Sequence, residues 1–322
     1  MKKWFFRAIL TSLAVILLST GVWAAQTLVP VGRTVGLELD ARGVTVAEFD
    51  RDLGKAARQA GLREGDMIVK ADGSPVATAQ DLQKYVSRCK EKLVLTVLRE
   101  GQELNLTLTP VPCPEGKRLG IFVRSGITGI GTVTYYDPET GDFGALGHGV
   151  SDRKGNLLPL EAGAALEAEV VSIQKGKVGT PGQLRGAFRQ DRILGDIRRN
   201  TPCGVFGTAP AGWPGTPLPV AQSEEIHTGE AIILSNLTGT EVEEFQVEII
   251  KIYPGSRAAG RNLLIHVTDD DLIARTGGIV QGMSGSPIIQ DGKLIGAVTH
   301  VLVNDPTTGY GIFIENMLDA AG

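Results

Sequence analysis

The segment GGIVQGMSGSPIIQDGKLIGAVTH occupies residues 277–300 and places Ser284 between glycines, ahead of an alternating apolar pattern. The residues after it predict a strand, a turn at Asp291–Gly292 and a second strand. The Gly-x-Ser-x-Gly elbow of α/β-hydrolases does not fit, because Ser286 stands where that motif has glycine and no helix follows. Ser284 is therefore either a nucleophile held among backbone amides or a hydroxyl in a tight turn.

A serine nucleophile needs a base, and the chain has four histidines. His148 stands in GALGHGVSD, where glycines on both sides leave its ring accessible, and we predict that it is the base. It precedes Ser284 by 136 residues, which fits the chain order of chymotrypsin-like enzymes. A Gly-x-Ser-Gly before a hairpin resembles the nucleophile segment of double-barrel serine proteases, which implies an oxyanion hole formed by the amides of Gly282 and Ser284.

The composition limits the class of protein. Glycine makes up 42 of 322 residues and is scattered among short Val/Ile/Leu/Thr runs, which favours many turns and a mainly β fold. The net charge is −4 and no basic block follows the N-terminal segment, so nucleic acid is not an expected partner. Cys89, Cys113 and Cys203 form no C-x-x-C pair, which argues against a zinc site. The three cysteines are expected to form either one disulfide and one free thiol or three free thiols. No metal or cofactor is expected.

Residues 1–25 carry basic residues, then an apolar stretch, then two alanines, and predict an export segment. The stretch is nearly long enough to span a bilayer, so both a cleaved signal and a retained anchor fit. In either case the rest of the chain is expected outside the cytoplasm.

Residues 31–110 predict a small α+β domain. The core AGLREGDMIVKADG reads as a helix end, a turn and a strand, and a helix capped by Thr78 and a hairpin follow. This order resembles a PDZ domain, and GLREGDMI is a specific signature. The resemblance implies that peptide C-termini bind as an added strand, with amides of Val35, Gly36 and Leu37 in TVGLEL holding the carboxylate.

The connector VPCPEGKRLG predicts a domain boundary, and residues 119–322 form the second domain. Many short apolar runs separated by glycine and proline predict a sandwich or barrel.

The export segment, the PDZ-like region, ALGHGVSD, ILGDIRRNTPCGVFG and the segment around Ser284, in that order, resemble the stage IV sporulation protein B peptidase family. The resemblance covers nearly the whole chain. It implies a chymotrypsin-like double β-barrel and a serine endopeptidase with His148, Asp269 and Ser284 as catalytic residues. Asp196 is the alternative orienting acid, since it lies closer to His148 in sequence.

The same resemblance implies a location between the forespore and mother-cell membranes. The implied partner is a regulatory membrane protein whose cleavage releases an intramembrane metalloprotease that processes a sigma-factor precursor. Two alternatives stay open, a PDZ-containing periplasmic quality-control protease and a non-catalytic PDZ adaptor with a protease-like domain.

The strand LIGAVTH follows the serine hairpin and is predicted to form a wall of the substrate pocket. This prediction places Thr299, His300 and Val301 along that wall. The alternative is that His300 points into the core or to solvent, because strand side chains alternate.

Overall fold

The computed structural model describes residues 26–151, 155–254 and 260–322. The predicted export segment, residues 1–25, lies outside the described residues. Within those three ranges, none of the helices has the length and hydropathy that crossing a bilayer demands.

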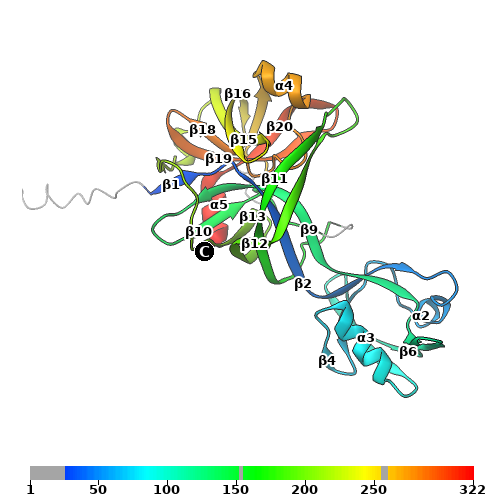
Figure 1. Cartoon of the computed structure of the whole chain (residues 1–322). Coiled ribbons are helices and arrows are strands. Elements are labelled where there is room, and N and C mark those ends of the chain that lie inside the picture. The colour runs from blue at the N-terminus through cyan, green and yellow to red at the C-terminus, as the bar shows by residue number, and fades with distance from the viewer. Residues whose placement is uncertain (1–25, 152–154, 255–259) are drawn as a thin grey trace, which may run out of the picture.

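Six antiparallel strands close into a first barrel (Figure 1). In spatial order they are β2 (Thr34–Phe49), β9 (Ile121–Tyr136), β10 (Asp142–Ala145), β13 (Gly204–Thr208), β12 (Gln183–Thr201) and β11 (Leu160–Gln174). Alternation along β2 turns Val35, Leu37 and Leu39 into the core, where each is almost fully buried. Two short strands, β1 (Thr27–Pro30) and β14 (Leu218–Pro219), extend the sheet beyond β9.

Residues 229–313 contain the strands of a second six-stranded barrel. Its strands, in spatial order, are β15 (Gly229–Thr238), β16 (Glu241–Ile252), β17 (Leu263–Val267), β20 (Asp305–Phe313), β19 (Lys293–Leu302) and β18 (Pro287–Gln290). On β16 the buried residues Phe245, Val247 and Ile249 alternate with exposed polar ones, as one-sided burial requires. The short helix η1 (Ser223–Glu225) precedes this barrel, and α4 (Asp270–Thr276) lies between β17 and β18.

The two barrels share an apolar contact. The C-terminal helix α5 (Ile314–Ala321) contributes Ile314 and Met317 to a buried cluster. The cluster also contains Leu28 of β1 and Phe206 of β13, from the sheet of the first barrel, and Leu294 of β19, from the second barrel. A chymotrypsin-like double barrel was predicted, and this architecture confirms it.

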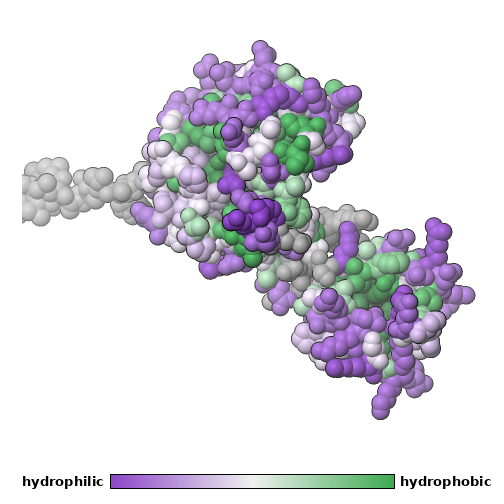
Figure 2. All heavy atoms as spheres, viewed as in Figure 1, coloured by the Kyte–Doolittle hydropathy of each residue, from purple (hydrophilic) through white to green (hydrophobic). Residues whose placement is uncertain are grey.

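A small α+β unit projects from the first barrel as a separate lobe (Figures 1 and 2). Its elements are α2 (Lys55–Gln59), β3 (Met67–Ala71), β4 (Ser74–Pro75), α3 (Ala79–Arg88), β5 (Leu93–Arg99), β6 (Gln102–Leu108), β7 (Val111–Cys113) and β8 (Gly116–Arg118). Thr78 caps α3 as predicted and forms a reciprocal capping box with Asp81. The lobe has its own core, which includes Ile68, Leu82, Val86 and Leu95.

The lobe is inserted into the first barrel rather than placed before it. The far part of β2 and the first residues of β9 belong to the lobe, where Val46 pairs with Val123 and Phe49 with Ile121. The near part of β2 belongs to the barrel. Residues 34–39 of the predicted small domain therefore lie in the barrel, and residues 119–125 of the predicted second domain complete the lobe.

The prediction that Val35, Gly36 and Leu37 bind a peptide carboxylate is wrong. These residues lie on β2 inside the barrel, where Val35 pairs with Glu167 on β11 and with Gly131 on β9. Because both edges of this part of the strand are already paired, a peptide cannot be added there as a further strand.

Candidate active site

A cavity of about 510 Å³ lies between the two barrels and is lined by both predicted reacting side chains, His148 and Ser284. His148 follows β10 of the first barrel, and Ser284 precedes β18 of the second. The other histidines outside this cavity have different partners: His227 pairs with Asp291, and His266 contacts Thr308. The structure thus brings together the predicted base and nucleophile across 136 residues of sequence.

The loop that carries Ser284 is held by backbone contacts on both sides. Its glycines Gly282 and Gly285 have φ of 103° and 97°, backbone conformations that residues other than glycine rarely adopt. The Ser284 carbonyl accepts from the Thr132 amide at 3.0 Å, and the Gly285 amide donates to the Val298 carbonyl at 2.7 Å. These contacts fix the loop against β9 on one side and β19 on the other.

The amides predicted for the oxyanion hole are those of Gly282 and Ser284, and both residues line the cavity. In the three described ranges, no protein group accepts a hydrogen bond from either amide. Two amides without acceptors beside a serine hydroxyl are what an oxyanion hole requires.

The hydroxyl of Ser284 donates to the carbonyl of Thr299 at 2.8 Å. For Ser284 to act as the predicted nucleophile, its hydroxyl proton would have to point to the predicted base, His148, instead of to Thr299.

The half-buried ring of His148 is placed by a tight backbone turn. Leu146 has φ of 69°, an uncommon conformation for a bulky residue, and Gly147 follows with φ of 66°. The Nδ1 atom lies 3.0 Å from the carbonyl of Gly149, which suits a proton on Nδ1 and leaves Nε2 free to accept one. Burial lowers the pKa of His148 below its usual value, and the Gly149 carbonyl opposes that shift. The ring is therefore neutral at neutral pH, as a base must be.

The predicted pocket residues Thr299, His300 and Val301 line the same cavity. The centroids of the His148 and His300 rings are 5.2 Å apart. Burial, and secondarily the nearby His148 and Arg261, lower the pKa of His300 to about 4, so it is neutral too. Its Nδ1 atom is buried without a partner among the described residues. A role in substrate selection stays a prediction.

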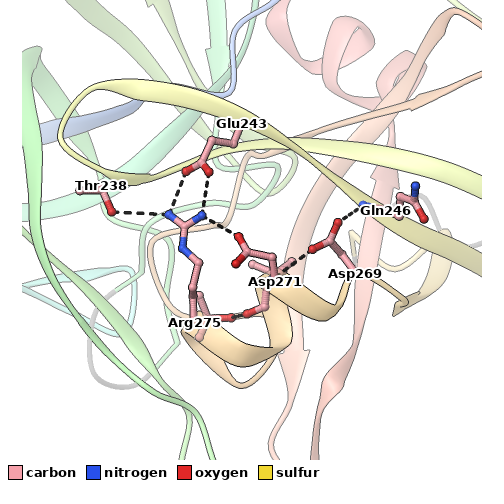
Figure 3. A network of polar contacts seen from close by, with 8 residues as sticks. Thr238, Glu243, Gln246, Asp269, Asp271 and Arg275 are labelled. Atoms are coloured by element: carbon pink, nitrogen blue, oxygen red, sulfur yellow. Dashed lines mark hydrogen bonds and ion pairs between the residues drawn. The ribbon is translucent and has the colours of Figure 1, made fainter.

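Asp269 lies elsewhere. It is the N-cap of α4, and its carboxylate accepts from the amides of Leu272 at 2.9 Å and Gln246 at 3.2 Å (Figure 3). Beside it, Arg275 forms an ion pair with Asp271 within α4 and a second ion pair with Glu243 that joins α4 to β16 (Figure 3). The predicted contact between Asp269 and His148 is absent from the described structure, because both carboxylate oxygens serve the helix cap and the neighbouring strand.

The alternative acid is not beside His148 either. Asp196 is an exposed residue of β12, in register with Ala164 and Thr208. Within residues 26–151, 155–254 and 260–322, the group that contacts Nδ1 of His148 is a backbone carbonyl, and no carboxylate hydrogen-bonds to the ring. The same ranges contain no group of three His, Cys, Asp or Glu side chains that could hold a metal ion.

Replacing Asp269 separates a capping role from a catalytic one. Asp269→Ala is expected to lower the free energy of unfolding by about 1 kcal/mol, the usual cost of losing an N-cap. Asp269→Asn retains a capping oxygen, and kcat is expected to stay within about threefold of wild type for both variants. Thermal unfolding and kcat on a fluorogenic peptide measure the two effects. A loss near the 10⁴-fold known for a comparable triad change, with unchanged stability, would show that Asp269 reaches His148 during the reaction.

A second cavity, of about 270 Å³, lies in the lobe between α3 and the start of β9. Leu82 and Val86 of α3 face Ile121 and Val123 across it. One edge of this part of β9 pairs with β2, and in the described part of the chain no strand pairs with the other edge. An unpaired strand edge beside a helix can accept an extended peptide as an added strand.

The loop before this edge turns sharply at a glycine. Gly120 has φ of 66°, and a side chain there would lie 2.3 Å from the carbonyl carbon of Leu53. Sequence reasoning missed this loop because RLG ends the predicted connector VPCPEGKRLG and the predicted second domain begins at residue 119. The signal was present as a glycine between two apolar residues ahead of a strand.

Comparison with protein families matches residues 115–318 to the SpoIVB peptidase S55 family and residues 32–109 to the PDZ domain family. Among similar proteins is one from Agrobacterium fabrum named as a zinc metalloprotease, 30% identical over 155 residues, which are 48% of this chain and 38% of that protein. Another, from Pseudomonas fluorescens, is named as a DegP-like periplasmic serine endoprotease and is 32% identical over 154 residues, 45% of this chain and 30% of that protein. The matched part of the chain thus spans less than two fifths of the length of either relative.

Among solved structures, the active form of the Rv3671c protease from M. tuberculosis is similar at 17% identity and a TM-score of 0.33, over 62% of this chain and 75% of that one. Its inactive form gives 15% identity and a TM-score of 0.35, over 60% and 82%.

Proposed function

The chain belongs to the SpoIVB peptidase S55 family and is a serine endopeptidase, and from this premise we propose that it is exported and cleaves a regulatory membrane protein. In this proposal the cleavage releases an intramembrane metalloprotease that processes a sigma-factor precursor during sporulation. The observation that carries the peptidase part is that His148 and Ser284, from different barrels, line one cavity. The apolar, basic-flanked stretch in residues 1–25 supports export.

The proposed chemistry follows from the groups around this cavity. The Ser284 hydroxyl turns from Thr299 toward His148, and its oxygen attacks the scissile carbonyl carbon while its proton passes to Nε2 of His148. The amides of Gly282 and Ser284 stabilise the negative oxygen of the tetrahedral intermediate. The proton on His148 then passes to the leaving amine, and water hydrolyses the acyl-enzyme by the same steps in reverse order.

The Gly149 carbonyl occupies the position at which an orienting acid usually acts, 3.0 Å from Nδ1 of His148. A carbonyl can fix the tautomer by accepting the Nδ1 proton, as an aspartate does, but it does not supply the full negative charge that stabilises an imidazolium. The proposal is therefore a Ser–His pair with a backbone orienting group, and it accounts for the position of Asp269.

The sporulation role is tested in the producing organism. With Ser284→Ala in the chromosomal gene, the sigma-factor precursor is expected to accumulate unprocessed and sporulation to stop, while the mutant protein stays at its normal level. If the precursor is processed normally but the mutant cells grow poorly when unfolded proteins accumulate, the quality-control alternative is favoured instead. The relative named as a DegP-like periplasmic serine endoprotease is a reason to test this alternative.

We propose that the groove between α3 and β9 binds the C-terminus of a target or regulator. Ala79 lines this groove at the start of α3, whereas the exposed Lys84 does not line it. Ala79→Trp is expected to weaken binding of free-carboxylate peptides at least tenfold by filling the groove, and Lys84→Trp to leave it unchanged. Fluorescence anisotropy with a C-terminal peptide library measures this, and amidated peptides provide the comparison.

The two variants also test what the groove does for cleavage. Both are expected to cleave a short unstructured peptide at the wild-type rate, because the groove lies outside the cavity that contains Ser284. Only Ala79→Trp is expected to slow cleavage of the full membrane substrate. Equal binding by Ala79→Trp and Lys84→Trp would exclude this groove as the peptide site.

A further inference from the structure

One residue of the first barrel contacts both catalytic segments. Thr132 lies on β9 and is fully buried. Its amide donates to the Ser284 carbonyl at 3.0 Å, and its hydroxyl donates to the Gly282 carbonyl at 2.7 Å. Its own carbonyl accepts from the Leu146 amide at 3.1 Å, in the turn that leads to His148. Thr132 therefore uses every polar group it has on the segments that carry the nucleophile and the base.

These contacts hold the peptide units around the oxyanion amide. The Gly282 carbonyl belongs to the peptide unit just before the one that carries the Ser284 amide, and the Ser284 carbonyl belongs to the unit just after it. Thr132 accordingly fixes the units on both sides of this amide. The loop needs such an anchor, because Gly282 adopts a conformation with φ of 103° and glycine has a wide choice of others.

The hydroxyl contact is specific to this position on the strand. Thr134 lies two residues further along β9, so it faces the same side, and it is also fully buried. Its hydroxyl has no hydrogen-bond partner among the described residues. Burial of a threonine in β9 thus does not by itself require a hydrogen bond, and Thr134 is a matched control for Thr132.

We infer that Thr132 is a positioning residue of the peptidase: its hydroxyl holds the Gly282–Ser284 segment so that the oxyanion amides point into the cavity. The inference rests on the proposed role of Ser284 as nucleophile. Thr132 touches neither substrate nor reacting atoms, so it acts through the loop.

The test compares three variants. Thr132→Val keeps the shape but removes the hydroxyl, and it is expected to lower kcat about 10²-fold, near the effect of losing one oxyanion donor, with KM within about threefold. Thr132→Ser keeps the hydroxyl and is expected to retain kcat within about fivefold. Thr134→Val removes the unpaired hydroxyl and is expected to retain wild-type kcat.

A second readout separates positioning from folding. A peptide boronate, which forms a tetrahedral adduct with the serine, is expected to bind Thr132→Val at least tenfold more weakly than wild type, while all variants unfold within a few degrees of it. Thr132→Ala supplies a second variant without the hydroxyl. Wild-type kcat and boronate affinity in the folded Thr132→Val and Thr132→Ala proteins would overturn the inference, and so would an equal loss in Thr134→Val.

The experiment also distinguishes failure of this inference from failure of the proposed nucleophile. Labelling the wild-type protein with a fluorophosphonate and mapping the modified residue identifies the nucleophile independently of Thr132. Modification at Ser284 with no effect of Thr132→Val refutes the positioning role alone. Modification at another residue refutes the assignment of Ser284 and removes the basis of the inference.

Discussion

Ser284→Ala is expected to reduce peptide cleavage by 10⁴-fold or more, because the variant has no nucleophile, and by on the order of 10⁶-fold if the effect matches that in other serine peptidases. His148→Ala is expected to have a similar effect, since the variant lacks the proposed general base. The double variant is expected to be no worse than either single one, because the two groups act as a unit. The measurement is kcat on a fluorogenic peptide.

The neighbouring Ser286 provides the matched control. Its side chain is fully buried, and its hydroxyl has no hydrogen-bond partner in the described structure. Ser286→Ala is therefore expected to keep wild-type kcat and to be labelled by a fluorophosphonate, which Ser284→Ala is not. If Ser284→Ala retains the wild-type rate, Ser284 is not the nucleophile, and loss of activity in Ser286→Ala would transfer the role to the second serine.

The features that sequence predicted well are local. Thr78 caps α3 because its hydroxyl reaches the amide three residues on, a contact that the sequence spacing contains in full. Gly282 and Ser284 line the cavity, and their role as an oxyanion hole stays a prediction. His148 and Ser284 are far apart in sequence, but their pairing followed from the order of motifs in double-barrel peptidases.

The features that sequence predicted wrongly depend on strand pairing between distant segments. TVGLEL reads equally well as an exposed edge strand and as a paired inner strand, because alternation shows only which face is apolar. The structure pairs Gly36 with Leu166 on one edge and Ile130 on the other. The amount of sequence between these residues gives no indication of their register, so the inserted position of the lobe could not be read from the sequence.

Asp269 shows a different limit. The run of three aspartates ahead of an apolar helix fits an N-cap, and the position relative to Ser284 fits the family's functional aspartate. Both readings were available, and sequence offers no measure of distance to choose between them. In the structure the cap is formed, and the amide of Gln246 occupies the second carboxylate oxygen.

Gly285→Ala is expected to reduce kcat at least 10²-fold, because the position beside the nucleophile has no room for a methyl group. A Cβ there would lie 2.0 Å from the Thr132 carbonyl oxygen and 2.6 Å from the Leu146 amide nitrogen. Those two atoms form the hydrogen bond that joins β9 to the segment leading to His148. The methyl group must therefore displace the Ser284 loop, the His148 segment or both, and a misplacement of about 1 Å can cost this much rate.

Gly292→Ala is the control for backbone strain. Gly292 also has a positive φ, of 72°, but a Cβ there meets no atom within 4 Å. The Gly292→Ala variant is expected to lower the free energy of unfolding by about 1 kcal/mol through backbone strain alone and to leave kcat within twofold of wild type. Near-UV circular dichroism establishes that both variants are folded before kcat is compared. A folded Gly285→Ala protein with wild-type kcat would show that the loop and the His148 segment can separate without harm, and the close packing around Thr132 would then have no part in catalysis.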